Sequence, residues 1–305
     1  MKVGVVGAGG VGGYFGARLA QAGNEVCVVA RGQHLAAIRE HGLRIRSIKG
    51  DASVAVTASE DPAEIGPCDV VLLCVKSYDT EHAAAQLGPL LSHGAAVVSL
   101  QNGIENEETI AASVGADRVI GGAAFIFSSI IEPGVVEHTG GPARLVLGEP
   151  NSKHSDRVER LLETLQGAGI DAEIAADIRV VLWTKFAFIC ATAGMTAATR
   201  LPLRDICNCP ESLDTLARVI DEVVGLARKE GVPLVDEVRE QGLGLAASVE
   251  PGSYSSLYHD LVTGRRMELE ALHGTVVRRS KRIGHPVPTC EAIYAILRPW
   301  AQRIS

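Results

Sequence analysis

The first sixteen residues constrain the fold more than any other stretch of the chain. Lys2 to Val6 is short, β-branched and apolar, which predicts a buried strand. Gly7-Ala8-Gly9-Gly10-Val11-Gly12 follows and fits the pattern G-x-G-x-x-G, and the apolar stretch after it predicts a helix that ends near Gly23. A strand, a glycine turn and a helix in this order predict a doubly wound α/β fold that binds a dinucleotide.

Each glycine of this turn has a distinct physical role. Gly7 allows the tight turn, Gly9 lets a pyrophosphate approach the backbone, and Gly12 lets the helix pack close to the strand. The start of the helix offers N–H groups and partial positive charge to phosphates. We therefore predict that the cofactor binds at Gly7, Ala8, Gly9, Gly10, Val11 and Gly12.

Length and charge narrow the class of protein further. A chain of 305 residues predicts two domains, and the net charge of −7 argues against an electrostatic grip on nucleic acid. No uninterrupted apolar run reaches the roughly 18 residues of a membrane helix. The strand that begins at Lys2 leaves no room for a signal peptide. We expect a cytoplasmic protein with neither nucleic acid nor a membrane as partner.

The seven cysteines are scattered through apolar segments, where they suit the role of small buried hydrophobic side chains. Cys207 and Cys209 form the only close pair, and no further cluster of cysteine or histidine accompanies them. A metal site needs more ligands than this pair supplies. We therefore predict no metal site.

The end of the second predicted strand bears on the choice of cofactor. The strand Glu25 to Ala30 runs into Arg31, with no acid at its tip. In this fold an acid there selects NAD, whereas a basic residue favours the 2′-phosphate of NADP. A guanidinium also matches phosphate bidentately. We predict that Arg31 binds NADP(H); the alternative is a solvated surface arginine.

Two further polar residues follow predicted central strands. Lys76 follows the strand Asp69 to Val75, and Asn102 follows the strand Ala96 to Leu100. Ligands of such sheets bind outside the carboxyl ends of the strands. We predict that Lys76 binds the cofactor and that Asn102 binds the nicotinamide ribose or a substrate. The alternatives are a lysine that points to water and an ordinary Asn-Gly turn.

The rest of the first half alternates between helical and strand patterns. His138 lies in a strand pattern, and we predict a structural role for it. The expected elements are a helix at 35–40, strands of a hairpin or an edge at 43–47 and 53–58, a helix at 80–91, a strand at 119–127, a β-ribbon at 134–138 and 144–147, a helix at 157–166 and a strand at 172–174.

From Asp177 onward the pattern is helical, which predicts one domain at 1–175 and another at 176–305. Asp177 suits the N-cap of a long helix through Thr199, and this helix carries Lys185 among aromatic residues. A buried lysine costs several kcal/mol unless it is paired or neutral, and low polarity lowers its pKa toward the range of proton transfer. Lys185 is therefore a candidate acid; the alternative is a lysine whose stem covers the aromatic rings.

The sequence after Thr199 predicts four more helices and contains one segment rich in hydroxyl groups. Ser256 lies in that segment, which suits anion binding or helix capping, and Glu268 follows on the next helix. The predicted helices span 213–229, 235–249, 267–282 and 289–297.

One known family carries this set of motifs over essentially the whole chain. The sequence resembles the ketopantoate reductases, also called 2-dehydropantoate 2-reductases. The resemblance implies a Rossmann-type α/β N-terminal domain and an all-α C-terminal domain like that of 6-phosphogluconate dehydrogenase. It also implies reduction of ketopantoate to pantoate with NADPH, on the route to pantothenate. It rests on the glycine loop, Arg31, Lys76, Asn102-Gly103, Leu182-Trp183-x-Lys185, and Ser256 with Glu268 twelve positions later.

The resemblance also implies roles for individual residues. Lys185 would donate the proton and contact the substrate, and Glu268 would be the carboxylate of the active site. Asn102 and Ser256 would hold the substrate, and Asn102 and Glu268 would also contact the cofactor. Arg31 and Lys76 would hold the phosphate end of NADP.

The chain departs from the family pattern at one place. Well-studied members carry asparagines four and eight residues after the lysine, on the same helical face, but this chain has Ile189 and Ala193 there. Thr192 and Thr196 are the nearest polar substitutes. The loss of a pocket amide shifts substrate preference. Another 2-oxo acid is therefore an alternative substrate.

Two further questions are the kind of protein and its oligomeric state. A non-catalytic NADP-binding regulator would need neither Lys185 nor Glu268, so their presence favours an enzyme. The apolar helices of the second half are also compatible with a homodimer.

Overall fold

The computed structural model describes residues 1–303, apart from the side chains at 92 and 93, and divides into two compact units. The N-terminal unit comprises Met1–Gln101 and Asn106–Ile178. The helical unit comprises Asn102–Glu105 and Arg179–Ser305. The sequence placed a boundary between residues 175 and 176 and gave no sign that Asn102–Glu105 belongs with the second half.

Within the described residues, the N-terminal unit is built on one ten-stranded sheet in the order β4-β3-β9-β8-β7-β6-β1-β2-β5, with β10 beside β9. This architecture confirms the Rossmann-type fold. The strands are β1 Lys2–Val6, β2 Glu25–Val29, β3 Leu43–Ser47, β4 Ala52–Val54, β5 Thr57–Ser59, β6 Cys68–Leu73, β7 Leu91–Ser99, β8 Val119–Glu132, β9 Val135–Gly148 and β10 Asp171–Ile174.

The central part of the sheet is parallel and reverses its winding at β1. Strands β2 and β6 both pair with β1 in parallel, β5 extends the sheet beyond β2, and β7 extends it beyond β6. Strand β1 therefore has β2 and β5 on one side and β6 and β7 on the other, so the strand order reverses there. Ligands of open α/β sheets bind outside the carboxyl ends of the strands at such a switch point.

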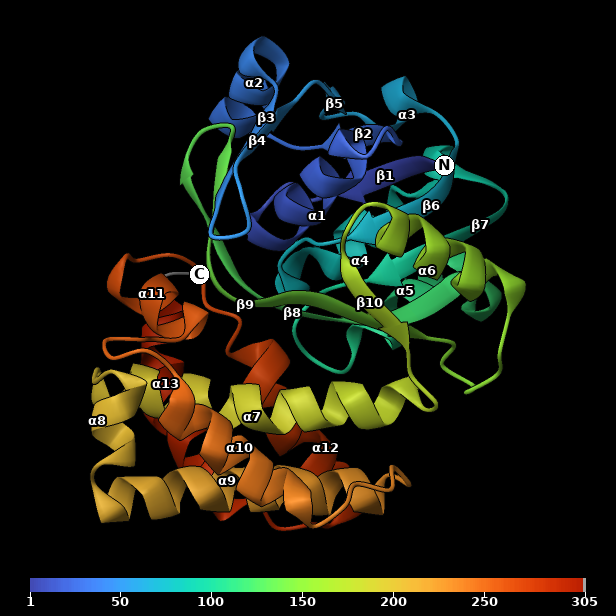
Figure 1. The fold of residues 1–305 in the computed structure, drawn as a ribbon. Coiled ribbons are helices and arrows are strands. Elements are labelled where there is room, and N and C mark those ends of the chain that lie inside the picture. Colours follow the sequence, from blue (N-terminus) through green and yellow to red (C-terminus); the bar gives the residue numbers. More distant parts are fainter. Residues whose placement is uncertain (304–305) are drawn as a thin grey trace. The chain divides into compact units, whose positions relative to one another are not determined.

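Helices cover both faces of this sheet (Figure 1). Successive strand residues alternate between two cores, because Val3 and Val5 pack into one and Val6 into the other. The first core includes α1 Gly10–Gln21, α2 Gly32–His41 and α6 Asp156–Gly167; the second includes α3 Pro62–Ile65, α4 Thr80–Ala85 and α5 Asn106–Val114.

Two predicted elements of this unit are wrong in extent. The predicted strand at 53–58 is two short strands, because β4 pairs antiparallel with β3 whereas β5 pairs parallel with β2. The predicted helix at 80–91 ends at Ala85, and a 3₁₀ turn at Gly88–Leu90 leads into β7. Pro89 lies in that turn, where its missing N–H and its ring oppose a continued α-helix.

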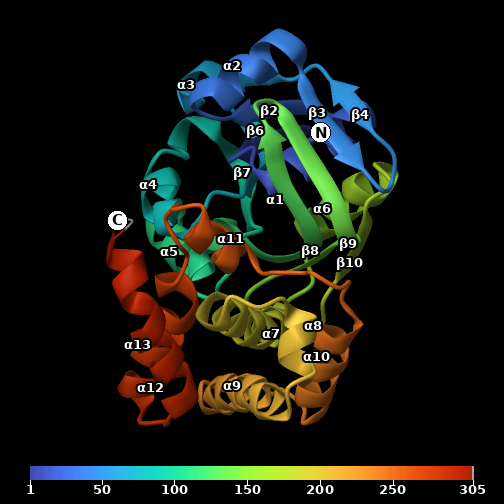
Figure 2. The ribbon, with the colours of Figure 1, turned by 90° about the vertical axis from the view of Figure 1, so that its left-hand side faces the viewer.

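The predicted β-ribbon at 134–138 and 144–147 is also wrong. Both segments belong to the single strand β9, which pairs antiparallel with the 14-residue strand β8 (Figure 2). The pairing register shifts beside Phe127, opposite a stretch in which Gly141 and Ala143 have φ values of 78° and 50°. These bulges interrupt the alternation that the sequence pattern relied on.

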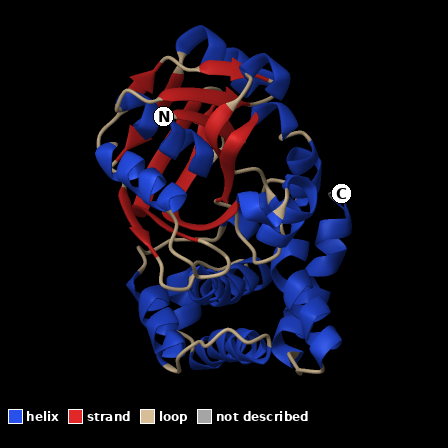
Figure 3. Ribbon diagram, turned by 90° about the vertical axis from the view of Figure 1, so that its right-hand side faces the viewer, coloured by secondary structure: helices blue, strands red, loops and turns tan. Residues whose placement is uncertain are grey.

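The described part of the helical unit contains helices and loops, and the strands of Figure 3 lie in the N-terminal unit. The all-α second domain is confirmed. The predicted helix at 267–282 begins only at Glu270, with a π-helical turn. The helices are α7 Ile178–Thr199, α8 Leu203–Cys207, α9 Pro210–Lys229, α10 Glu237–Ser248, α11 Ser256–Val262, the π-helical η4 Glu270–Gly274, α12 Thr275–Ile283 and α13 Pro288–Arg303.

Helix α7 contributes many residues to the helical core. By length and composition alone it is long and apolar enough to cross a membrane, although Arg179 and Lys185 interrupt it. Of its most apolar window, 61% is buried inside the structure. Phe186, Ala187 and Cys190 are among the residues it contributes to the core. This burial is typical of a core helix.

His273 gives the helical core a dependence on pH. Its side chain is fully buried, neither ring nitrogen has a hydrogen-bond partner, and burial lowers its pKa to about 4. As the pH falls, this histidine is protonated near pH 6.5 in the unfolded chain but only near pH 4 in the folded protein. Stability is therefore complete above pH 6.5 and falls by roughly 3 kcal/mol as the pH approaches 4.

We expect His273→Leu to remove this contribution. Urea unfolding at pH 7 and pH 4.5 should show a smaller loss of stability in the variant than in the wild-type protein. His154→Ala, which alters an exposed histidine, should keep the wild-type loss. An unchanged loss in His273→Leu would contradict the assignment.

Candidate functional site

The glycine loop joins the carboxyl end of β1 to the start of α1. Gly7 has a φ of 95°, which L side chains rarely adopt. A Cβ on Gly12 would lie 2.2 Å from the carbonyl oxygen of Gly7, so the helix approaches the turn too closely for any side chain. A Cβ on Gly9 would meet nothing within 4 Å. The loop therefore has the closed and open faces expected of a phosphate-binding turn.

His34 supports this loop from the first turn of α2. Its Nδ1 accepts a hydrogen bond of 3.0 Å from the Gly134 N–H, so its proton lies on Nε2, which donates to the Ala8 oxygen at 2.8 Å. Burial lowers the pKa of His34, although the bond to Ala8 opposes this shift. The neutral imidazole thus ties the glycine loop to the β8–β9 turn. Sequence reasoning missed it, because a histidine three residues after Arg31 matches no motif.

The predicted cofactor-binding residues Arg31 and Lys76 lie on neighbouring segments. Arg31 is the exposed N-cap residue of α2, and its Nη2 lies 3.2 Å from Asp79 Oδ2. Lys76 is the N-cap residue of the 3₁₀ turn Ser77–Asp79 that carries this acid. The ion pair with Asp79 therefore links Arg31 to the short turn that begins at Lys76. Asp79 is a functional candidate that the sequence analysis did not single out.

The candidate acid Lys185 lies in the middle of α7 and is half-buried. Its neighbours Trp183 and Phe186 are buried and pack edge to face, with ring centroids 5.8 Å apart. Because these rings fix the helix in the core, the backbone from which the lysine extends is rigid.

Thr192 and Thr196, two of the threonines on this helix, donate their hydroxyl hydrogens to the helix backbone. Thr192 Oγ1 donates to the Phe188 oxygen at 2.9 Å, and Thr196 Oγ1 donates to the Thr192 oxygen at 2.8 Å. Thr196 Oγ1 also lies 2.7 Å from Ser255 Oγ. Their hydroxyl hydrogens are therefore committed to bonds within the protein, where threonines in helices often donate to the preceding turn.

The other predicted substrate and catalytic residues of the helical unit differ in their surroundings. Glu268 is 7% exposed and lies just before the π-helical turn. Ser256 is exposed at the start of α11, and the N-cap is its neighbour Ser255, which accepts a bond of 3.1 Å from the Tyr258 N–H. The capping role considered for Ser256 therefore belongs to Ser255.

Asn102 belongs to the helical unit. Sequence reasoning placed it at the sheet edge with Gly9 and Lys76, but the segment Asn102–Glu105 packs with residues 179–305. It thus shares a compact unit with Lys185 and Glu268.

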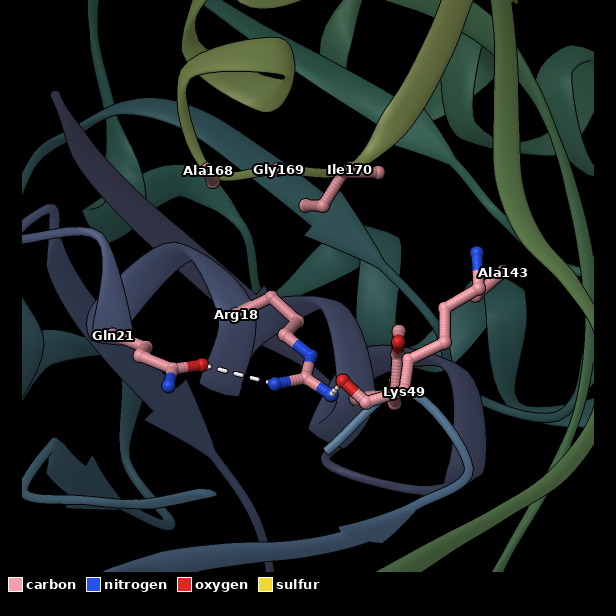
Figure 4. A pocket seen from close by; sticks show the side chains of 8 residues that line it. Arg18, Gln21, Lys49, Ala143, Ala168, Gly169 and Ile170 are labelled. Atoms are coloured by element: carbon pink, nitrogen blue, oxygen red, sulfur yellow. Dashed lines mark hydrogen bonds between the residues drawn. The ribbon is translucent and has the colours of Figure 1, made fainter. Parts of the chain in front are cut away.

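A separate pocket of about 160 Å³ lies in the N-terminal unit, at the end of α1 away from the glycine loop (Figure 4). Arg18 lines it, but its guanidinium donates to Gln21 Oε1 at 3.0 Å and to the Gly50 oxygen at 2.5 Å. Lys49 Nζ donates to the Pro142 oxygen. Since these cations are satisfied by protein oxygens and none of the predicted site residues lines the pocket, we do not assign it to the functional site.

Among residues 1–303, no group of three or more histidine, cysteine, aspartate and glutamate side chains could hold a metal ion. The close pair Cys207 and Cys209 consists of free thiols.

Comparison with known proteins identifies the family. Residues 3–152 match the family model "Ketopantoate reductase PanE/ApbA", and residues 177–301 match "Ketopantoate reductase PanE/ApbA C terminal". The chain belongs to the ketopantoate reductase family. As a member of this family it is an oxidoreductase.

Relatives match over nearly the full length. A 2-dehydropantoate 2-reductase of Halobacterium salinarum is 34% identical, with 98% of each chain covered. The uncharacterized oxidoreductase YkpB of Bacillus subtilis is 32% identical, again with 98% of each covered. A crystal structure of a PanE/ApbA family ketopantoate reductase from Ralstonia eutropha has a TM-score of 0.92 and 35% identity, and covers 100% of this chain and 99% of its own.

Two glycines of the loop make a matched test of its role. Gly12→Ala should destabilise the fold by about 3 kcal/mol, because the added methyl group meets backbone. Gly9→Ala should fold with an unchanged melting temperature but bind a dinucleotide at least ten times more weakly, because its methyl group occupies the open face. Thermal unfolding and fluorescence titration measure the two effects. Normal cofactor affinity in Gly9→Ala would rule out pyrophosphate at this face.

Proposed function

We propose that this protein reduces ketopantoate (2-dehydropantoate) to pantoate with NADPH, as a step of pantothenate biosynthesis. The observation that supports the proposal is that Lys185, Glu268 and Asn102 belong to the same compact unit of a chain of the ketopantoate reductase family. The named 2-dehydropantoate 2-reductases among its relatives support the same activity.

The N-terminal unit is the proposed cofactor-binding part. The residues present fit a dinucleotide, because Gly9 exposes backbone at the start of α1 and no acid lies in the first turn of that helix. Arg31 and Lys76 would hold the 2′-phosphate of NADP. When bound, the nicotinamide supplies the hydride.

The helical unit supplies the proposed acid chemistry. Lys185 as ammonium donates a hydrogen bond to the ketone oxygen, stabilises the charge that develops there, and gives its proton to form the hydroxyl group. It then regains a proton from solvent. The carboxylate of Glu268 fixes the orientation of Lys185 or of a substrate hydroxyl. Asn102 and Ser256 would bind the polar groups of the substrate.

A second candidate is the reduction of another 2-oxo acid. Ile189 and Ala193 present apolar groups where well-studied members have amides, and the nearby threonine hydroxyls are already engaged. An apolar wall favours a less polar side chain on the oxo acid. The 32% identical relative that is called only an uncharacterized oxidoreductase leaves room for such a substrate.

The acid role of Lys185 is tested by its removal. We expect Lys185→Ala to lower kcat by at least about a hundredfold, because a positioned general acid contributes a factor of that order or more. The dissociation constant of NADPH should change less than about twofold, since most of the proposed cofactor contacts come from the glycine loop, Arg31 and Lys76 of the N-terminal unit. Stopped-flow absorbance and fluorescence titration measure the two. Lys229→Ala, on the exposed end of α9, is the control. Unchanged turnover in Lys185→Ala would refute the mechanism.

The cofactor assignment is tested by the pair of Arg31 and Asp79. Arg31→Ala should weaken the binding of NADPH by about tenfold and leave the binding of NADH unchanged, since a charge-assisted bond to the 2′-phosphate is lost. Asp79→Asn should instead favour NADPH over NADH, because the carboxylate 3.2 Å from the guanidinium opposes a phosphate there.

Asp214→Asn removes an ion-paired carboxylate from α9 and should alter neither affinity. Equal effects of Arg31→Ala on both cofactors would contradict the assignment of the 2′-phosphate.

A further inference from the structure

The chain leaves the N-terminal unit for only four residues, Asn102–Glu105, between β7 and α5. Both ends of this excursion converge on one hydroxyl. Gln101 Nε2 donates to Thr80 Oγ1 at 2.7 Å, and Thr80 Oγ1 donates to Asn106 Oδ1 at 3.0 Å. All three side chains are buried, so the points of exit and return are firmly held in the N-terminal unit.

The excursion itself is built into the helical unit. Ile104 is part of the hydrophobic core of that unit. Glu105 Oε2 accepts bonds from Thr275 Oγ1 at 2.8 Å and from Arg278 Nη2 at 2.9 Å. Its Oε1 accepts from Arg279 Nε at 3.2 Å. The carboxylate is therefore the polar anchor of the segment, beside an apolar one.

The buried arginine partner of this carboxylate is shared with a second acid. Arg279 is 5% exposed, and besides Glu105 it donates to Glu230 Oε2 at 2.5 Å. A buried guanidinium is tolerated only when its charge is paired, so removal of a partner is costly. Burial raises the pKa of Glu105, but bonds from Arg278 and Thr275 and the two arginine charges bring it below its ordinary value. Glu105 is therefore ionised at neutral pH.

The anchor lies three residues after Asn102. Gly103 between them has a φ of 107°, a conformation that fixes a sharp turn without a side chain. Asn102 thus lies between Gln101, which is held in the N-terminal unit, and Ile104 and Glu105, which are held in the helical unit.

We propose that Glu105 is a positioning residue, whose ion pairs with Arg278 and Arg279 hold Asn102 in the unit that carries Lys185 and Glu268. The inference rests on the proposed function, in which Asn102 contacts the substrate. The amide and the acid are then parts of one rigid body, and substrate orientation does not depend on the cofactor-binding unit. Loss of the anchor affects the oxo acid more than the cofactor, because the glycine loop, Arg31 and Lys76 provide most of the proposed cofactor contacts.

The test is a double-mutant cycle between Glu105→Gln and Asn102→Ala. We expect Glu105→Gln to lower kcat/KM for the oxo acid by between about tenfold and a hundredfold, because a shift of an ångström is enough for such a loss. The dissociation constant of NADPH should stay within about twofold. In the Asn102→Ala background, Glu105→Gln should lower kcat/KM for the oxo acid by less than a further factor of about two, because its effect passes through Asn102.

Glu230→Gln is the matched control, since it also removes a carboxylate from Arg279 but does not touch the excursion. It should lower the melting temperature and leave kcat/KM within about twofold. If Glu105→Gln fails to fold, Thr275→Val removes one donor to the same carboxylate and should show a smaller loss with the same dependence on Asn102.

Equal losses from Glu105→Gln with and without Asn102 would overturn the inference, and so would a loss of the same size in Glu230→Gln. An inert Asn102→Ala would also overturn it. The proposed function fails separately, if Lys185→Ala keeps its turnover.

Discussion

The close approach of α1 to the end of β1 is the constraint on which the N-terminal unit depends. No side chain fits between Gly12 and the Gly7 carbonyl, and this contact directs the start of the helix toward the edge where the strands reverse their order. His34 then fixes the loop from α2 through the Ala8 oxygen. The site is thus made of backbone, held by packing and by one neutral imidazole.

In the helical unit, by contrast, the candidate groups are side chains, and polar side chains buried in its apolar core are held by bonds to partners. Arg279 is buried between Glu105 and Glu230. Lys185 extends from a core helix, and Glu268 is buried near the π-helical turn. Buried charges cost stability unless they are paired, and Arg279 meets this condition through its bonds to Glu105 and Glu230. A π-helical turn is also common at functional sites.

Local signals predicted much of the fold from the sequence. The strand and glycine turn at Lys2–Gly12 carry a short-range motif, and the helix through Lys185 is a long apolar stretch without proline; both elements are present in the structure. The strand β9 was divided into two because its glycines resemble a turn, although pairing with β8 carries the strand through them. The helix after Thr80 was overextended because its apolar spacing concealed the effect of Pro89.

In the candidate site, too, the sequence shows the residues with local motifs but not those that depend on long-range contacts. Motif residues such as Lys185 are visible in the sequence, but their supports His34, Asp79 and Glu105 act through contacts that only the fold creates. The placement of Asn102 could not be predicted either, because the strand pattern before it points to the sheet edge, whereas Ile104 and Glu105 pack with distant helices. Pairing over a long sequence separation leaves no periodic signal.

The proposed reductase activity is measured most directly as the oxidation of NADPH by the wild-type protein with a panel of 2-oxo acids, ketopantoate among them, beside a matched NADH assay. We expect saturable turnover of at least one branched 2-oxo acid, with stoichiometric formation of the 2-hydroxy acid and a preference for NADPH. Tight binding of NADPH with no oxidation by any oxo acid would contradict this expectation and would leave a cofactor-binding regulator in place of an enzyme.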